Sequence, residues 1–191
     1  INFFCYVDYV TEFITKYVKG RLVLVGHSMG GMVISQVAEN LPDKINHLVY
    51  VAAFLPENDQ SLADAERKTS LPSVSIKMRL EEEKGTVHLD HQDCYELFYQ
   101  KCKAQDIKYA LSLIQPQPIK PFLAKVALGK NFQTISKTYI QCLQDKAINI
   151  EDQRRMSAKC QYIKTLDTDH SPFFSNYQDL GNILLQTLYL L

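Results

Sequence analysis

The chain has 191 residues, which is enough for one domain with a hydrophobic core. Hydrophobic residues make up 46%, charged residues make up 22%, and the formal net charge is zero. A neutral chain lacks the basic surface that nucleic acids and anionic membranes require, so we expect neither as a partner. No apolar run reaches the ~18 residues of a membrane span. Five cysteines without a CxxC pair indicate reduced thiols in a cytoplasmic protein, with no disulfide framework and no structural zinc site.

The first part of the chain predicts a parallel β-sheet. Residues 3–19 repeat apolar side chains every three or four positions, as in an amphipathic helix. The continuous apolar run at 22–25 predicts a strand buried on both faces, a helical pattern follows at 32–39, and 47–54 predicts a second buried strand. Strand, helix and strand at this spacing form a βαβ unit, so we predict the α/β class.

The middle of the chain interrupts this rhythm. Residues 56–131 contain charged helical stretches and a proline-rich piece but no buried strand of the earlier kind. We therefore expect a helical cap insertion over one end of the sheet. The βα pattern then resumes, with strands and helices alternating at 138–143, 151–158, 161–166 and 176–190. This pattern divides the chain into a core of residues 1–55 and 132–191 and an insertion of residues 56–131.

A nucleophile motif lies between the first predicted strand and its helix. Gly26-His27-Ser28-Met29-Gly30 matches the G-x-S-x-G nucleophile elbow, in the strand–turn–helix context that this motif requires. Glycines at both ends let the strand and helix backbones approach, and the serine projects from a strained turn. The helix then directs its N-terminal amides at the reacting oxygen. The motif predicts Ser28 as nucleophile and the Met29 N–H as an oxyanion-hole donor; the alternative is a glycine-rich turn with an inert serine.

A serine hydroxyl needs a base, and His170 is the best placed of the five histidines. It follows the last predicted strand, in a loop at the same carboxyl edge of the sheet as Ser28, where active sites of open α/β sheets form. We expect its imidazole within hydrogen-bonding distance of Ser28 Oγ. We expect His27 to point into the packing under the turn, and we also include it among the candidate substrate-binding residues. The other three histidines lie at a strand start or in the insertion: His47, His88 and His91.

The acid should precede the histidine, in the chain order Ser, Asp, His. Asp145 follows the first strand after the insertion, again at the carboxyl edge, and would orient the imidazole and stabilise the imidazolium. Asp152 lies one turn into the next helix. Asp167 and Asp169 are too near His170 in the chain to support it easily from a neighbouring strand. Asp145 is therefore the predicted acid, and Asp152 and Asp169 are the alternatives.

Five segments resemble the branch of α/β-hydrolases that contains plant methylesterases, hydroxynitrile lyases and bacterial esterase relatives. They are LVGHSMGGM at 24–32, VYVAAFLP at 49–56, ALSLIQP at 110–116, YIQCLQDKAI at 139–148 and DHSPFF at 169–174. The resemblance covers nearly the whole chain and implies the α/β-hydrolase fold, with Ser28 as nucleophile, Asp145 as acid and His170 as base. It also implies a mechanism without metal or cofactor, in which Ser28 attacks an ester carbonyl and water activated by His170 releases the acyl group.

Two departures from that branch narrow the interpretation. Its hydroxynitrile lyases have a lysine directly after the catalytic histidine, where this chain has Ser171, so ester hydrolysis is favoured over lyase chemistry. Its members also begin with several strands and a His-Gly loop that supplies a second oxyanion-hole amide. This chain opens on Ile1 without a counterpart, so we expect that N-terminal strands are missing and that the strand at 22–25 has one open edge.

The leading hypothesis is a carboxylesterase that acts on a small, mostly apolar ester and needs no cofactor. The candidate substrate-binding residues of the insertion are Leu97, Phe98 and Phe122, together with Tyr99; they either line an apolar pocket or form the core of the insertion itself. One alternative is a hydroxynitrile lyase-like enzyme, and another is a hydrolase-fold binding protein or receptor with little turnover. The sequence does not separate the esterase from the receptor. A homodimer is a candidate assembly.

Overall fold

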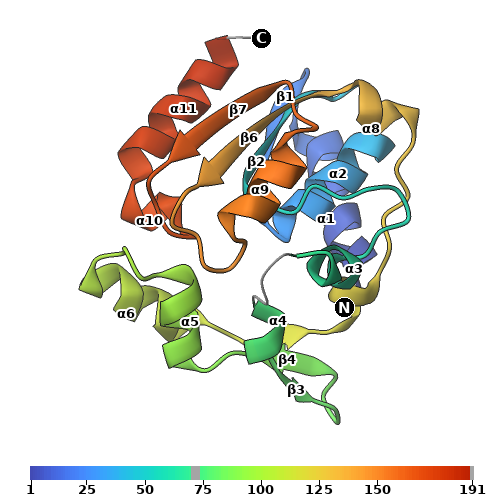
Figure 1. The fold of residues 1–191 in the computed structure, drawn as a ribbon. Coiled ribbons are helices and arrows are strands. Elements are labelled where there is room, and N and C mark those ends of the chain that lie inside the picture. The colour runs from blue at the N-terminus through green and yellow to red at the C-terminus, as the bar shows by residue number, and fades with distance from the viewer. Residues whose placement is uncertain (70–73, 190–191) are drawn as a thin grey trace.

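A parallel sheet of four strands forms the centre of the molecule (Figure 1). The computed structural model describes residues 1–69 and 74–189. The strands follow the order β1 (Leu22–Ser28), β2 (Ile45–Ala53), β6 (Ser136–Cys142) and β7 (Tyr162–Leu166), and each pairs in parallel with its neighbour. Each strand overlaps a segment that the sequence predicts as a strand, and the α/β class is confirmed.

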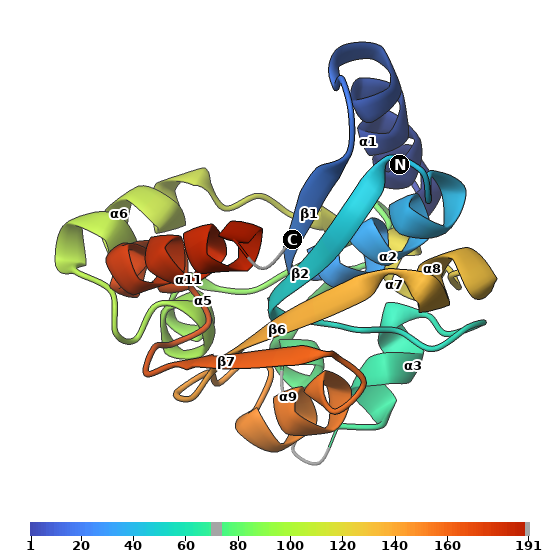
Figure 2. The ribbon, with the colours of Figure 1, turned by 90° about the horizontal axis from the view of Figure 1, so that it is seen from above.

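Helices cover both faces of this sheet (Figure 2). The elements on one side are α1 (Phe3–Tyr17), α2 (Gly30–Asn40), α8 (Lys130–Thr134) and α9 (Ile150–Ser157). On the other side, α11 (Tyr177–Tyr189) follows the short α10 (Pro172–Ser175) and packs on β7. The last residue of the predicted 176–190 helix lies outside the described residues. No helix within residues 1–69 and 74–189 is long and apolar enough to cross a membrane.

Two apolar clusters, one on each face of the sheet, form the core. Side chains alternate along β2, so that Leu48 and Tyr50 join α1 and α2, whereas Val49 and Val51 face the opposite side. The second cluster is completed from β6, β7 and α11 by Ile140, Leu166 and Leu180. All four β2 side chains are buried, as the continuous apolar run predicts for a strand covered on both faces.

The chain leaves the sheet between β2 and α8, and Figure 1 shows α5 and α6 beyond the ends of β6 and β7. The helices of this segment are α3 (Leu62–Arg67), α4 (Val74–Lys77), α5 (His91–Phe98), α6 (Ala104–Leu113) and α7 (Lys120–Leu123). Three short strands form an antiparallel sheet: β3 (Arg79–Glu81), β4 (Thr86–His88) and β5 (Gln117–Pro118). The insertion that the sequence predicts as helical therefore also contains a small sheet, which the sequence did not indicate because strands of two or three residues are too short to show a period of two.

β1 lies at an edge of the parallel sheet, since among the described residues its only strand neighbour is β2. Val25 at this edge is 44% exposed. A hollow of about 560 Å³ runs along the edge between β1, α1 and the start of α2, and its lining includes Ile1, Tyr9 and Met29. The open strand edge that the sequence predicts is therefore present.

Candidate active site

Ser28 ends β1 in a strained backbone conformation. Its φ is 53°, in the left-handed region that residues other than glycine rarely adopt. Met29 follows as the N-cap of α2, and amides at the start of a helix have no acceptor within the helix. Strand, sharp turn and helix therefore meet at the serine as the motif predicts, with the Met29 N–H beside it.

Close backbone contacts require glycine at two positions around the elbow. One of these, Gly26, is predicted by the motif, and the other is Gly31 instead of the predicted Gly30. A Cβ added to Gly26 would lie 2.8 Å from the carbonyl oxygen of Gly30, so this glycine is required for the strand to approach the helix. A Cβ on Gly30 itself would meet nothing within 4 Å, which contradicts the reason we gave for that position. The second tight contact is at Gly31, where a Cβ would lie 2.2 Å from the Phe54 carbonyl oxygen.

Asp145 and His170 form a buried hydrogen-bonded pair. His170 Nδ1 lies 2.8 Å from Asp145 Oδ2, and since a carboxylate only accepts, Nδ1 carries the proton and donates it. The other carboxylate oxygen accepts the backbone N–H groups of Ala147 at 2.7 Å and Ile148 at 2.9 Å. In the neutral imidazole this arrangement places the proton on Nδ1 and leaves Nε2 as an acceptor, which is the tautomer that a general base requires.

The structure favours Asp145 over both alternative acids. Asp152 forms an ion pair with Arg155 on its own helix, with a distance of 3.0 Å between Arg155 Nη2 and Asp152 Oδ1. The Asp169 carboxylate accepts hydrogen bonds from Lys101 and Ser175 instead of from the His170 ring. The aspartate predicted from chain order is therefore the one that contacts the histidine.

Gln153, a residue that our sequence analysis missed, supports Asp145 from α9. Its fully buried amide donates from Nε2 to Asp145 Oδ2 at 3.1 Å and to the Ile148 carbonyl at 2.7 Å. Its Oε1 accepts the N–H of Cys142 at 2.9 Å. The sequence could have indicated Gln153, because it lies three residues before Met156 on the buried face of the helix, where an apolar side chain is usual.

The expected hydrogen bond between Ser28 and His170 is not formed within the part of the chain that the structure describes. Such bonds are often long when no substrate is bound and shorten in the reacting complex. The ring of Phe98 packs on the His170 ring, with 5.3 Å between the centroids, and His170 is only 3% exposed. The predicted base is thus covered by a side chain of the insertion.

His27 does not lie where a substrate-binding residue should. Its Nε2 is 2.7 Å from the His170 carbonyl oxygen, so the His27 ring donates this hydrogen bond. Its ring also contacts Phe173 edge to face and lines the hollow beside β1 instead of the cavity at Ser28. Burial, and to a lesser extent the neighbouring His170 charge, lowers the pKa of His27 to about 3. His27 therefore packs under the turn, as the sequence predicts. It is not among the residues that line the cavity at Ser28, so the structure does not support it as a substrate-binding residue.

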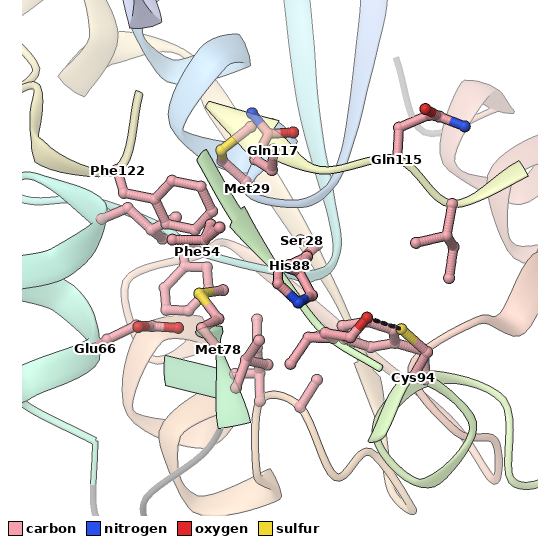
Figure 3. A pocket seen from close by; sticks show the side chains of 18 of the residues that line it. Ser28, Met29, Phe54, Glu66, Met78, His88, Cys94, Gln115, Gln117 and Phe122 are labelled. Atoms are coloured by element: carbon pink, nitrogen blue, oxygen red, sulfur yellow. Dashed lines mark hydrogen bonds between the residues drawn. The ribbon is translucent and has the colours of Figure 1, made fainter. Parts of the chain in front are cut away.

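Ser28 and Met29 line a cavity of about 280 Å³ together with side chains of the insertion (Figure 3). Phe98, Phe122 and Tyr99 are part of its lining. Leu97 is buried but is not among the lining residues, so it belongs to the core of the insertion. Most of the wall is apolar, and besides Ser28 its polar side chains include Glu66, His88, Gln115 and Gln117. Burial raises the pKa of the Glu66 carboxyl.

Metal-binding groups do not gather at this site. Within residues 1–69 and 74–189, no cluster of three or more His, Cys, Asp or Glu side chains could hold a metal ion. The five cysteine thiols are all free.

The sequence matches a known family over most of its length. The model of the alpha/beta hydrolase family matches residues 2–181. The chain belongs to the α/β-hydrolase family. A chloroplastic methylesterase-like protein of Arabidopsis thaliana is 29% identical to this α/β-hydrolase over 194 residues, which are 95% of the chain and 50% of the relative. Methylesterase 1 of the same plant is 27% identical over 198 residues, 95% of the chain and 74% of the relative. The chain spans about half the length of several curated relatives that it matches.

Solved structures agree with the fold of this α/β-hydrolase. A pyrethroid hydrolase from Sphingobium faniae JZ-2 superposes with a TM-score of 0.85 at 22% identity, over 97% of this chain and 77% of the other. A methylesterase from Arabidopsis gives a TM-score of 0.84 at 20% identity, over 100% of this chain and 79% of the other. At these identities the likeness shows the fold alone, and the methylesterase-like branch rests on the sequence relatives.

Proposed function

We propose that the protein is a serine hydrolase that cleaves a small carboxylic ester through an acyl-enzyme intermediate. One observation carries the proposal: Ser28, strained at φ 53°, opens into an apolar cavity at the end of the sheet where the Asp145–His170 pair also lies. Strain of this kind persists only where the surrounding structure holds it, and it concentrates at functional sites. A purely structural turn has no need of a buried Asp–His pair at the same edge.

The chemistry follows from these atoms. His170 Nε2 takes the proton of Ser28 as Oγ attacks the ester carbonyl, and the Asp145 carboxylate stabilises the imidazolium that forms. The Met29 N–H donates to the oxyanion of the tetrahedral intermediate. Collapse of this intermediate breaks the bond to the alcohol, which leaves with the proton from His170. Water then repeats the sequence with His170 as base, and it releases the acid and regenerates Ser28.

The cavity supports a small and mainly apolar substrate. About 280 Å³ is at the low end of ligand pockets, and aromatic side chains from the insertion form part of the wall. Relatives named methylesterases support the choice of an ester with a small alcohol group. We therefore expect short-chain esters to be better substrates than long-chain ones.

Lyase chemistry is the less favoured function. The position after His170 holds Ser171, which is buried and donates its backbone N–H to Asp169 Oδ1 at 3.2 Å. The hydroxynitrile lyases of the branch that this chain resembles have a lysine at this position. The neutral Ser171 does not supply that cation.

The test uses p-nitrophenyl acetate and mandelonitrile as parallel substrates for the whole protein. The proposal predicts ester turnover that Ser28→Ala abolishes and that Ser112→Ala, on the exposed face of α6, leaves unchanged. Cyanide release from mandelonitrile faster than ester turnover would overturn the reaction type. Absence of turnover with both substrates would favour a binding protein or receptor.

A further inference from the structure

Asp169, the residue before His170, is a fully buried carboxylate in a dense set of hydrogen bonds. Its Oδ2 accepts the backbone N–H of Lys101 at 2.8 Å and the thiol of Cys102 at 3.4 Å. Both donors belong to the turn that follows α5 in the insertion. On this side, the carboxylate therefore ties the insertion to the loop that carries His170.

The other carboxylate oxygen holds the histidine loop itself. Asp169 Oδ1 accepts the backbone N–H of Ser171 at 3.2 Å and the hydroxyl of Ser175 at 2.7 Å. The peptide of His170 is held from the elbow as well, because its carbonyl accepts the hydrogen bond from His27 at 2.7 Å. Four donors converge on one carboxylate, which is how a buried anion without a salt bridge is satisfied.

Neighbouring contacts place this junction directly against the predicted base. Phe98, at the end of α5, packs on the His170 ring, and Tyr99 packs on Phe174 at 6.3 Å between centroids. Gln100 Nε2 donates to the carbonyl of Gln144, which precedes Asp145, at 2.7 Å. Five consecutive residues of the insertion, 98–102, thus contact the two loops that carry the acid and the base.

We propose that Asp169 is a positioning residue, which fixes His170 and the 98–102 segment of the insertion as one unit over the nucleophile. The proposal rests on the proposed ester hydrolysis and adds the way in which the insertion controls the base. The loop between β7 and α10 needs this second support, because Asp145 fixes only the rotation of the imidazole ring. Displacement of a reacting group by about 1 Å can cost roughly 100-fold in rate.

The chemistry of the four donors requires a carboxylate. In Asp169→Asn one oxygen becomes an NH₂ group, which must face the backbone N–H of either Lys101 or Ser171. Neither amide can turn to accept, so one hydrogen bond is lost and two donors oppose each other whichever way the side chain is placed. Burial, followed by the charge of Asp169, raises the pKa of Cys102 to about 12, so that its thiol remains a donor.

The experiment measures kcat and KM separately for p-nitrophenyl acetate, with the whole protein. We expect Asp169→Asn to lower kcat at least roughly tenfold while KM changes little, since the base is displaced but the cavity remains. Asp167→Asn is the matched control, because this exposed carboxylate of the same loop pairs with two side chains, the Lys101 ammonium and Gln144, instead of with backbone amides. It should retain the wild-type kcat.

A milder pair of variants keeps the test valid if Asp169→Asn fails to fold. Cys102→Ser retains a donor toward Asp169 Oδ2 and should keep the wild-type kcat, whereas Cys102→Ala removes it and should lower kcat. A third readout is independent of turnover: hydrogen exchange of the Lys101 amide should accelerate in Cys102→Ala and in folded Asp169→Asn, and not in Asp167→Asn.

The outcomes separate this proposal from the proposed function. Unchanged kcat in both Asp169→Asn and Cys102→Ala, or a rise in KM alone, would overturn the positioning role. If the wild-type protein hydrolyses no ester, the proposed function fails, and the exchange of the Lys101 amide then decides whether Asp169 holds the insertion. An amide that exchanges equally fast in wild-type and variant protein would overturn that as well.

Discussion

At the scale of single residues, the direction of one hydrogen bond determines whether His170 can act as a base. Asp145 accepts the Nδ1 proton, so in the neutral ring Nε2 keeps a free lone pair, and the proposed mechanism uses this lone pair to take the Ser28 proton. The carboxylate in turn is fixed by two backbone amides and by Gln153. This set of contacts is the part of the site that sequence order predicted best, because the order Ser, Asp, His and the carboxyl edge of the sheet together select Asp145.

Asp145→Asn tests this tautomer. An amide NH₂ opposite Nδ1 forces the ring to carry its proton on Nε2, where it can no longer accept from Ser28, so we expect kcat for ester hydrolysis to fall by roughly 10³- to 10⁴-fold. Steady-state kinetics would measure the loss, with Asp179→Asn on the exposed first turn of α11 as control. A loss of tenfold or less would show that Asp145 does not orient the base.

His27 makes the fold sensitive to acid. Its pKa in the folded protein is about 3, below the ordinary 6.5, so the unfolded chain binds the additional proton between these two values. The contribution of His27 to the free energy of unfolding is therefore fully present above pH 6.5 and is lost as the pH decreases toward 3. At pH 5 the loss from this residue is about 2 kcal/mol.

Urea unfolding at pH 7.5 and at pH 5 measures this contribution. His27→Gln keeps an N–H donor for the His170 carbonyl but does not titrate, so its free energy of unfolding should decrease less between the two pH values. Burial also lowers the pKa of His47, so the variant should still lose some stability in acid through this second histidine. Equal pH dependence in wild type and variant would contradict the assignment to His27.

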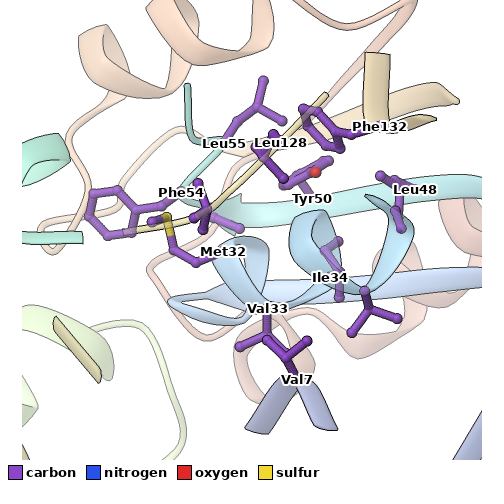
Figure 4. Packing of buried hydrophobic residues seen from close by; sticks show 14 of the residues in the cluster. Val7, Met32, Val33, Ile34, Leu48, Tyr50, Phe54, Leu55, Leu128 and Phe132 are labelled. Carbon is purple, nitrogen blue, oxygen red and sulfur yellow. The ribbon is translucent and has the colours of Figure 1, made fainter. Parts of the chain in front are cut away.

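At the scale of elements, the contact between α2 and the end of β2 sets the position of the elbow. Figure 4 shows Met32 of α2 beside Phe54 and Val33 pointing toward Val7 of α1. Gly31, the residue before Met32, lies against the backbone carbonyl of Phe54, where no Cβ fits. The local motif alone could not predict this role, since the role depends on Phe54, which lies 23 residues later in the chain.

Gly31→Ala and Gly30→Ala form a matched pair in consecutive positions of one helix. The first should lower the free energy of unfolding by about 1–3 kcal/mol or more, because the Phe54 carbonyl must move. The second should leave stability unchanged or raise it slightly, since its Cβ faces open space. Thermal unfolding of both variants measures the difference, and equal effects would contradict the contact at Phe54.

Sequence periodicity predicted the parallel strands and the long helices, because their burial is continuous or regularly spaced. It did not predict the β3–β4–β5 sheet, whose strands are too short for a pattern. It also did not predict the hydrogen bond from His27 to the carbonyl of His170, which lies 143 residues away in the chain. Phe98 and Phe122 line the cavity whereas Leu97 does not, a choice that depends on how the insertion folds over the sheet.

At the scale of the whole molecule, the two edges of the sheet differ in character. β1 contains no charged residue and borders an apolar hollow, whereas β7 carries Lys164 on the opposite edge. Unprotected apolar edges pair with other chains, and edge lysines prevent this. We therefore expect residues 1–191, expressed by themselves, to self-associate through the edge at β1.

Val25→Lys should reduce this association, because it places a charge on the exposed edge of β1. Ile163→Lys is the control on β7, where Ile163 has a similar exposure of 47% against 44% for Val25. Light scattering at increasing protein concentration would compare the two variants with wild type. Equal association in all three proteins would show that the β1 edge is not the surface involved.

The central claim, that Ser28 carries the acyl group during ester hydrolysis, has one direct measurement. The whole protein is mixed with p-nitrophenyl acetate, quenched with acid within the first turnovers, digested and examined by mass spectrometry. Our account predicts one acetyl group on the peptide that contains Ser28, lost on further incubation and absent from Ser28→Ala. Ester hydrolysis at the wild-type rate by Ser28→Ala, or an acetyl group that persists only on another residue, would contradict it.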